Sequence, residues 1–190
     1  MVMVFDVETN GLFGEDSVLS FSCVILNDDM EIVEEIDRYY YAEERYNSKA
    51  IRVNGLTIDV LKEKRKGVRY PRFFKNDRVI KRLFIDNNID LFIAHNIDFD
   101  VAFVENNFNI EICEEKCYCT MREVQFLYNA PYVHSVTGEP KFPKLVEALE
   151  WGEIDTKKIH EKTGKWFHDS LFDVYCTLEL YKKLEKIEKD

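Results

Sequence analysis

The sequence predicts a single domain of mixed α/β architecture, and three observations support this prediction. The chain has 190 residues, which suits one domain with a real hydrophobic core, spanning residues 1–190. Residues 2–7 form an apolar run with no polar face until Asp6, which is typical of a central buried strand. Two more strand-like segments follow, and helical and strand-like segments then alternate, which favours a mixed sheet.

The first half of the chain is predicted to place a hairpin beside the first strand. Residues 18–26 and 31–41 are rich in β-branched and aromatic side chains, and the polar turn NDDM separates them. Residues 48–57 carry the turn signal Asn54-Gly55 and are expected to form a loop. Residues 79–85, after Pro71, are expected to form a helix.

Short strands and helices alternate in the second half. The apolar residues 91–95 predict a short buried strand, and residues 118–127 predict a short strand that runs into a helix. Further helices are expected over residues 99–108, over residues 143–151 with Pro143 at the start, and over residues 170–188, where apolar side chains recur at helical spacing.

Charge is distributed unevenly along the chain. The formal net charge is −10, which by itself disfavours a nucleic-acid binder. Residues 62–82, however, hold ten basic and only two acidic residues, with Tyr70, Phe73 and Phe74 among them. Basic residues can follow phosphates while aromatic rings stack on bases. The alternative is a solvated helix face with a few core aromatics.

Other bulk features favour a cytoplasmic protein with reduced thiols and no membrane contact. No apolar run approaches the ~20 residues that span a bilayer, and no basic signal-peptide segment precedes the first strand. The cysteine count of five is odd, and Cys113, Cys117 and Cys119 show no CxxC pattern. Ordinary half-buried thiols are therefore expected, with a zinc site as the alternative.

Two carboxylates follow the first strand's apolar run, within the segment FDVETNGL of residues 5–12. Side chains two apart on a strand point to the same face, so Asp6 and Glu8 project together at the strand end where open α/β sheets place ligands. Gly11 is free to take a positive φ in the turn that follows. Adjacent carboxylates raise each other's pKa, and a hard cation such as Mg²⁺ removes that conflict. The alternative is that Asp6 and Glu8 are surface acids at the end of a strand and bind no ligand.

A second polar cluster, AHNIDFD at residues 94–100, follows the predicted strand at residues 91–95. His95 and Asn96 precede two acids, Asp98 and Asp100, at the start of the next helix. One acid is expected to cap that helix, since aspartate does this well. The cluster holds more polar groups than a cap requires.

The third cluster is HDSLFD, residues 168–173. Five residues of helix leave His168 and Asp173 roughly 140° apart, so the two converge only if His168 lies in the loop before the helix and Asp169 or Ser170 caps it. A loop histidine suits general-base chemistry near neutral pH. Taken alone, a simple helix start would explain the segment.

In this order and spacing, the three segments resemble the DEDD superfamily of 3′→5′ exonucleases. The H-x4-D spacing of His168 and Asp173 is that of the histidine subgroup (DEDDh), whereas the tyrosine subgroup would need Tyr where Asp169 stands. The similarity covers about residues 1–184 and is greatest to the proofreading epsilon subunit of bacterial DNA polymerase III and its stand-alone relatives. It implies a ribonuclease-H-like fold with a five-stranded mixed sheet flanked by helices.

The resemblance also implies a catalytic set of Asp6, Glu8, Asp100, His168 and Asp173. The four carboxylates would hold two divalent cations, Mg²⁺ or Mn²⁺, in a two-metal-ion displacement. Asp6 would bridge both ions, Glu8 and Asp173 would complete the ion that binds the attacking water, and Asp100 would serve the other ion. His168 would take the proton from that water as general base. The product would be a nucleoside 5′-monophosphate.

A site for a single-stranded 3′ end is implied by the same resemblance, with six substrate-binding residues: Thr9, Asn10, Leu12, Asn54, His95 and Phe99. Leu12 would wedge between the last two bases. Asn54 stands in IRVNGLT, where the family often carries His. The oligoribonuclease branch tends to have Met where Thr9 stands, so DNA is favoured over RNA. A polymerase partner is compatible with the resemblance.

Three alternatives remain at this point. The first is an RNA-directed 3′→5′ exoribonuclease of the same superfamily. The second is a non-catalytic nucleic-acid-binding module on this fold, which the filling of all five polar positions disfavours. The third is a structural metal protein built on the cysteine cluster.

Overall fold

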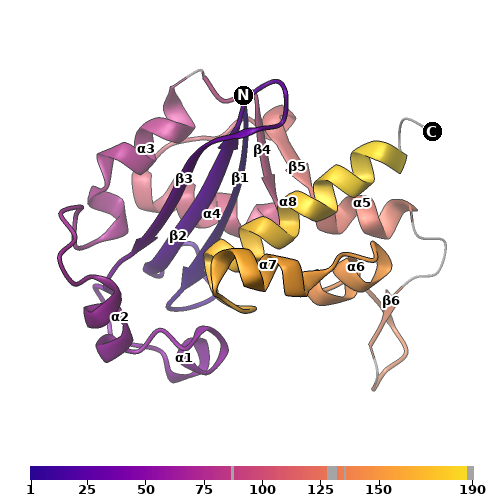
Figure 1. The fold of residues 1–190 in the computed structure, drawn as a ribbon. Helices are drawn as coiled ribbons and strands as arrows, with labels where there is room; N and C mark the ends of the chain where they lie inside the picture. Colours follow the sequence, from indigo (N-terminus) through magenta and orange to yellow (C-terminus); the bar gives the residue numbers. More distant parts are fainter. Residues whose placement is uncertain (87, 128–131, 135, 188–190) are drawn as a thin grey trace.

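A five-stranded mixed sheet forms the centre of the computed structural model, which describes residues 1–86, 88–127, 132–134 and 136–187 (Figure 1). The strands are β1 (Val2–Thr9), β2 (Val18–Leu26), β3 (Ile32–Tyr39), β4 (Leu91–Ala94) and β5 (Cys117–Cys119), in the order β3-β2-β1-β4-β5. β1 pairs antiparallel with β2 and parallel with β4. The predicted fold class, the central first strand and the β2-β3 hairpin are confirmed.

Helices cover both faces of this sheet. One face buries Met3, Phe5 and Val7 of β1 against α3 (Arg78–Ile85) and α4 (Ile97–Phe108). The other face buries Val4 against α5 (Thr120–Leu127), α6 (Leu145–Trp151) and α8 (Ser170–Ile187), and α8 lies across the strands in Figure 1. Because successive side chains of a strand alternate between faces, positions 6 and 8 share the α8 face with Val4.

The predicted loop over residues 48–57 is wrong, because α1 (Ser48–Asn54) occupies it. The side chain of Asn47 accepts a hydrogen bond from the N–H of Lys49 at the start, and Gly55 ends the helix with a φ of 69°. No residue of α1 is fully buried. Its caps therefore stabilise this helix, which has no buried apolar face that hydrophobic periodicity could reveal.

Other elements depart from the prediction in smaller ways. α2 (Ile58–Lys64), α7 (Thr156–Thr163), the turns η1 (Phe74–Asn76) and η2 (Glu114–Lys116), and the hairpin of β6 (Tyr132–Val133) and β7 (Pro140–Lys141) were not expected. α6 begins at Leu145 instead of at Pro143. Lys144 is extended, and its N–H donates to Glu147 in the first turn at 2.7 Å, so Pro143 lies outside the helix.

Two of the three aromatic side chains in the basic segment of residues 62–82 pack in or against the core, and the third, Phe73, is half-buried. Phe74 is 2% exposed and packs on Phe21 and Phe108. The hydroxyl of Tyr70 accepts a hydrogen bond from the N–H of Tyr39 at 3.0 Å. The structure therefore favours core aromatics beside a solvated basic surface over a base-stacking platform.

The cysteines behave as ordinary thiols. All five are free, and Cys119 is buried while Cys113 is exposed. Within the described ranges, no cysteine belongs to a cluster of potential metal ligands. None of the helices in the described part of the chain has both the length and the apolar character that a bilayer crossing requires.

Candidate active site

A cavity of about 440 Å³ opens where β1 and β4 end. Ten of the eleven site residues predicted from the sequence line it: Asp6, Glu8, Thr9, Leu12, Asn54, His95, Phe99, Asp100, His168 and Asp173. The first and last of these residues, Asp6 and Asp173, lie more than 160 positions apart in the sequence. The fold brings the three motifs to one cavity, as the resemblance implied.

β1 supplies the first two carboxylates. Asp6 and Glu8 lie opposite Ser22 and Ser20 of β2, and the pairing shifts register just after Glu8. Contrary to the expectation for the turn, Gly11 does not adopt a positive φ. A Cβ there would lie 1.9 Å from the carboxylate of Asp16, so a side chain at this position would require Asp16 to move and give up the hydrogen bond that its Oδ2 accepts from the N–H of Phe13.

The third carboxylate, Asp100, lies in the first turn of α4 and is 3% exposed. Its Oδ1 accepts a hydrogen bond from the backbone N–H of Val7 at 3.0 Å, which ties α4 to β1 between the other two acids. The expectation that Asp98 or Asp100 caps α4 is wrong. Asn96 occupies the cap position with a φ of 69°, and exposed Asp98 pairs with Arg122 at 3.0 Å.

The fourth carboxylate, Asp173, lies in the first turn of α8, with His168 in the loop before the helix. Asp169 caps the helix, since its Oδ1 accepts from the N–H of Leu171 at 3.2 Å. His168 takes a left-handed φ of 67°, and its N–H donates to Asp173 Oδ2 at 3.1 Å. The other oxygen, Asp173 Oδ1, is buried and has no hydrogen-bond partner among the residues that the structure describes.

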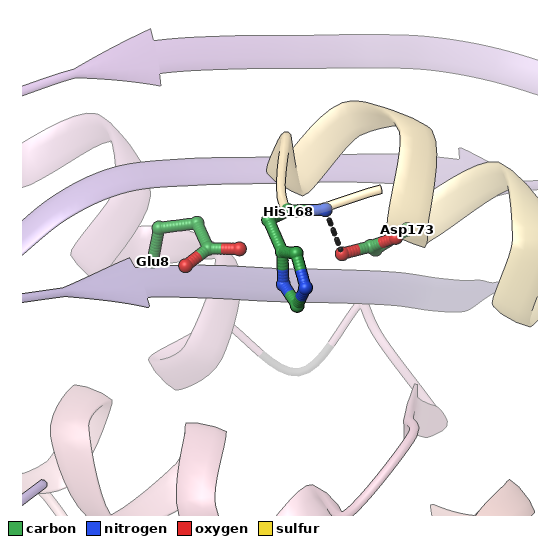
Figure 2. Close-up of side chains that lie close together, drawn as sticks. All are labelled: Glu8, His168 and Asp173. Atoms are coloured by element: carbon green, nitrogen blue, oxygen red, sulfur yellow. Dashed lines mark hydrogen bonds between the residues drawn. The ribbon is translucent and has the colours of Figure 1, made fainter. Parts of the chain in front are cut away.

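Glu8, His168 and Asp173 point toward one another from β1 and from the start of α8 (Figure 2). One ligand atom of each lies within 4.8 Å of the others, close enough to share a cation. Asp6 and Asp100 face the same cavity. Four carboxylates and one imidazole therefore surround a single space.

Burial raises the pKa of all four carboxyl groups, and the negative charges of nearby acids, including Asp169 beside Asp173, raise them further. Burial followed by the negative charge of Asp100 holds the pKa of Asp6 well above its usual range. Burial and then Asp173 raise the pKa of Glu8 to about 9, while burial raises that of Asp100 to about 8 and that of Asp173 to about 7. A site of this kind gains most from a bound cation, which stabilises the ionised forms.

We expect the metal-free protein to lose stability as the pH rises. A carboxyl group whose pKa is raised by folding keeps its proton in the folded state after the unfolded chain has lost it. The free energy of unfolding therefore falls from about pH 4, where the unfolded chain ionises, up to the folded pKa values of about 7 to 9. In chelator, the melting temperature should be lower at pH 8 than at pH 5.

Thermal unfolding at a series of pH values tests this expectation. Asp6→Asn should flatten the dependence, whereas Asp98→Asn, which alters an exposed acid of the neighbouring motif, should leave it unchanged. Added Mg²⁺ should raise the melting temperature most at high pH. Equal melting temperatures from pH 5 to 8 in chelator would show that the carboxylates do not repel one another as described.

Of the predicted substrate-binding residues, Asn10 does not line the cavity. It is 2% exposed, and its amide donates to Glu44 Oε1 at 2.6 Å while its Oδ1 accepts from the N–H of Asn47 at 2.9 Å. Asn10 thus holds the start of α1 against the end of β1, and its side chain is not among the groups that line the cavity. Leu12, by contrast, is 80% exposed at the rim.

Asn54 and His95 line the cavity, but their side-chain polar atoms already form hydrogen bonds within the protein. Asn54 donates to the carbonyl of Thr9 at 3.0 Å and accepts from the N–H of Leu56. The Nε2 of His95 lies 3.1 Å from the Pro143 carbonyl, which can only accept, and Nδ1 lies 3.0 Å from the hydroxyl of Thr120. Burial lowers the pKa of His95 to about 4, so His95 is neutral and offers its ring rather than a charge.

The sequence interpretation missed the wall that α1 contributes. Lys49, Ala50 and Val53 line the cavity together with Asn54. Ala50, Val53 and Asn54 stand three and four positions apart, the spacing of one helix face. That spacing was a usable signal, but the turn pair Asn54-Gly55 outweighed it.

The sequence of the chain matches the family described as Exonuclease (RNase_T) over residues 3–181. Two curated relatives are the PolC-type DNA polymerase III of Listeria monocytogenes and that of Listeria welshimeri, 27% and 26% identical over 199 aligned positions. Each alignment covers 95% of this chain, and the chain spans only 13% of the length of either relative.

Solved structures share the fold at low sequence identity. Exonuclease X in complex with 5′ overhanging duplex DNA superposes with a TM-score of 0.70 at 17% identity, covering 100% of this chain and 94% of that one. Escherichia coli Exonuclease I with a dT13 oligonucleotide gives 0.69 at 18% identity, covering 97% and 40%. The Saccharomyces cerevisiae Pan2 RNA exonuclease module with AAGGA RNA gives 0.61 at 16% identity, covering 100% and 29%.

Proposed function

The chain belongs to the exonuclease family, and on this premise we propose that it is a metal-dependent 3′→5′ exonuclease of the DEDDh type. It would hydrolyse single-stranded DNA from the 3′ end to nucleoside 5′-monophosphates. The observation that carries the proposal is the convergence of four carboxylates and His168 on one cavity. The family match over residues 3–181 supports one exonuclease domain across the chain.

The four carboxylates fit a pair of divalent cations. Asp6, Glu8, Asp100 and Asp173 offer only oxygen ligands, which Mg²⁺ and Mn²⁺ prefer. The buried Oδ1 of Asp173 has no hydrogen-bond partner in the described part of the chain, as expected for an oxygen that binds a ligand. Bound cations would neutralise the carboxylates and stabilise the negative charge that develops on the phosphate.

The protein's own groups would position and deprotonate the nucleophile. His168 is exposed to the cavity and close to Glu8 and Asp173, so its imidazole can accept the proton of a water that attacks the terminal phosphate. The bond between phosphorus and the 3′ oxygen of the preceding nucleotide then breaks. The backbone hydrogen bond from His168 to Asp173 keeps the imidazole beside the carboxylates during this step.

DNA is the favoured substrate, and RNA is the second candidate. Thr9 follows Glu8, and the curated relatives are DNA polymerases. Exonuclease X and Exonuclease I were solved with DNA, whereas the Pan2 module is an RNA exonuclease solved with RNA. Since the relatives are polymerases and much longer than this chain, we also propose a polymerase as partner.

A comparison of substrates tests the proposal. Labelled single-stranded DNA, duplex DNA and RNA of one sequence are incubated with the protein in Mg²⁺, Mn²⁺ or excess chelator. We expect degradation of single-stranded DNA with either metal and none in chelator. Faster degradation of RNA would support the second candidate, and binding without degradation under all conditions would indicate a non-catalytic module.

A further inference from the structure

The ammonium group of Lys165 stands at the centre of a polar network behind the candidate active site. It contacts Asp37 Oδ2, lies 2.9 Å from Asp169 Oδ1, and donates to the hydroxyl of Tyr39 at 3.0 Å. The Tyr39 hydroxyl in turn donates to Asp169 Oδ2 at 3.1 Å. The Lys165 side chain is only 15% exposed.

This network joins β3 to the loop that carries His168. Asp37 and Tyr39 belong to β3, whereas Lys165 and Asp169 bracket the loop between α7 and α8. The loop is also held to α7, because the carbonyl of Lys165 lies 2.9 Å from His160 Nδ1 and the rings of His160 and Trp166 stack with their centroids 3.8 Å apart. Three positions beyond Lys165, His168 adopts its left-handed φ of 67°, a conformation that non-glycine residues hold only when their surroundings impose it.

The pairing of the strands places this network in line with the carboxylates of Asp6 and Glu8. Ser20 and Ser22 belong to β2, the strand between β3 and β1. On the β3 side, Tyr39 pairs with Ser20 and Asp37 with Ser22. On the β1 side, Glu8 pairs with Ser20 and Asp6 with Ser22. Along this path, the Ser22 hydroxyl donates to Asp37 Oδ1 at 2.9 Å. The Ser170 hydroxyl lies 2.7 Å from the hydroxyl of Ser22 and 3.0 Å from that of Ser20. A continuous polar stripe therefore crosses three strands beneath the start of α8.

We propose that Lys165 is a positioning residue that holds the loop of residues 164–169 against β3, so that the His168 imidazole stays over the carboxylates. This inference rests on the proposed function. A largely buried ion pair is a poor source of stability, because desolvation offsets the attraction. Its value here is geometric, since it fixes one conformation of a loop that would otherwise relax to ordinary φ values.

Lys165→Met tests the proposal, because methionine retains most of the side-chain bulk and removes the charge. We expect kcat to fall about 10- to 100-fold, the loss typical of residues that orient a site group, with KM little changed. Lys182→Met is the matched control, since Lys182 forms an ion pair with Glu179 on the exposed side of α8, away from the cavity. The control should keep the parental kcat.

The decisive comparison combines the variant with His168→Ala. If Lys165 acts through His168, Lys165→Met should have little further effect in the His168→Ala background, because the two changes share one cause. If the fold-losses in kcat of the two single variants instead multiply in the double variant, the proposal is overturned. If Lys165→Met does not fold, Tyr39→Phe removes one hydroxyl of the network and should show the same dependence on His168.

A readout without catalysis separates this inference from the proposed function. Backbone hydrogen exchange of the His168 amide, which Asp173 protects, should accelerate at least about tenfold in Lys165→Met and not in Lys182→Met. Unchanged exchange would overturn the positioning role even if the parent is a nuclease. Inactivity of the parent with accelerated exchange in the variant would contradict the proposed function alone.

Discussion

Asp6→Asn should abolish turnover while leaving the protein folded. Asp6 faces the cavity between Glu8 on its own strand and Asp100 on α4, and the proposal assigns it to both cations. A catalytic metal contributes several kcal/mol to transition-state stabilisation, and each 1.4 kcal/mol is a factor of ten, so the rate should fall by at least about 10³-fold. The folded protein should not suffer, because the replaced carboxylate is repelled by its neighbours.

Two measurements on the same samples check this expectation. Hydrolysis is followed in Mg²⁺ and the melting temperature is measured in chelator, where Asp6→Asn should unfold at or above the parental temperature. Asp98→Asn serves as the control, since this acid is 71% exposed and pairs with Arg122. Substantial residual activity together with a lowered melting temperature would mean that Asp6 is a surface acid that closes a strand.

His168→Ala should slow hydrolysis by about 10²- to 10⁴-fold, the usual contribution of a positioned general base. Metal binding should survive, because all four carboxylates remain. Because a general base must be unprotonated to accept a proton, hydrolysis by the parent should be slower at acidic pH. In the variant the rate should instead depend more steeply on hydroxide at alkaline pH.

His134→Ala is the matched control for this variant. His134 is exposed beside β6, its backbone N–H donates to the carbonyl of Glu139 at 2.9 Å, and it is not among the described residues that line the cavity. The control should reproduce the parental rate and pH profile. If His168→Ala stays within about threefold of the parent at pH 7, well below the contribution of a general base, His168 only starts α8.

Two relations within the proposed catalytic set could be predicted from the sequence because their geometry is local. Asp6 and Glu8 share a face through the two-residue period of β1, and His168 can approach Asp173 because Asp169 caps α8. Each relation is encoded within six residues. The convergence of the three segments was supplied by resemblance, since spacing alone does not bring distant strand and helix ends together.

What could not be predicted depends on contacts between distant positions. Asn10 turns away from the cavity because Glu44, 34 positions later, binds its amide. His95 is neutral and occupied because Pro143, 48 positions later, accepts from its ring. α1 has no fully buried residue to give it an apolar stripe, so the helical spacing of Ala50, Val53 and Asn54 is its only signal in the sequence, and the turn pair Asn54-Gly55 points against it.

One measurement tests the central claim most directly: the products formed from a linear single-stranded DNA labelled at its 5′ end, incubated with the protein and Mg²⁺ beside a circular strand of the same sequence. A 3′→5′ exonuclease that uses this metal-binding cavity should shorten the labelled strand one nucleotide at a time, leave the circle intact, release nucleoside 5′-monophosphates and stop in excess chelator. Cleavage of the circle, early loss of the 5′-terminal label as a mononucleotide, or full activity in chelator would contradict it.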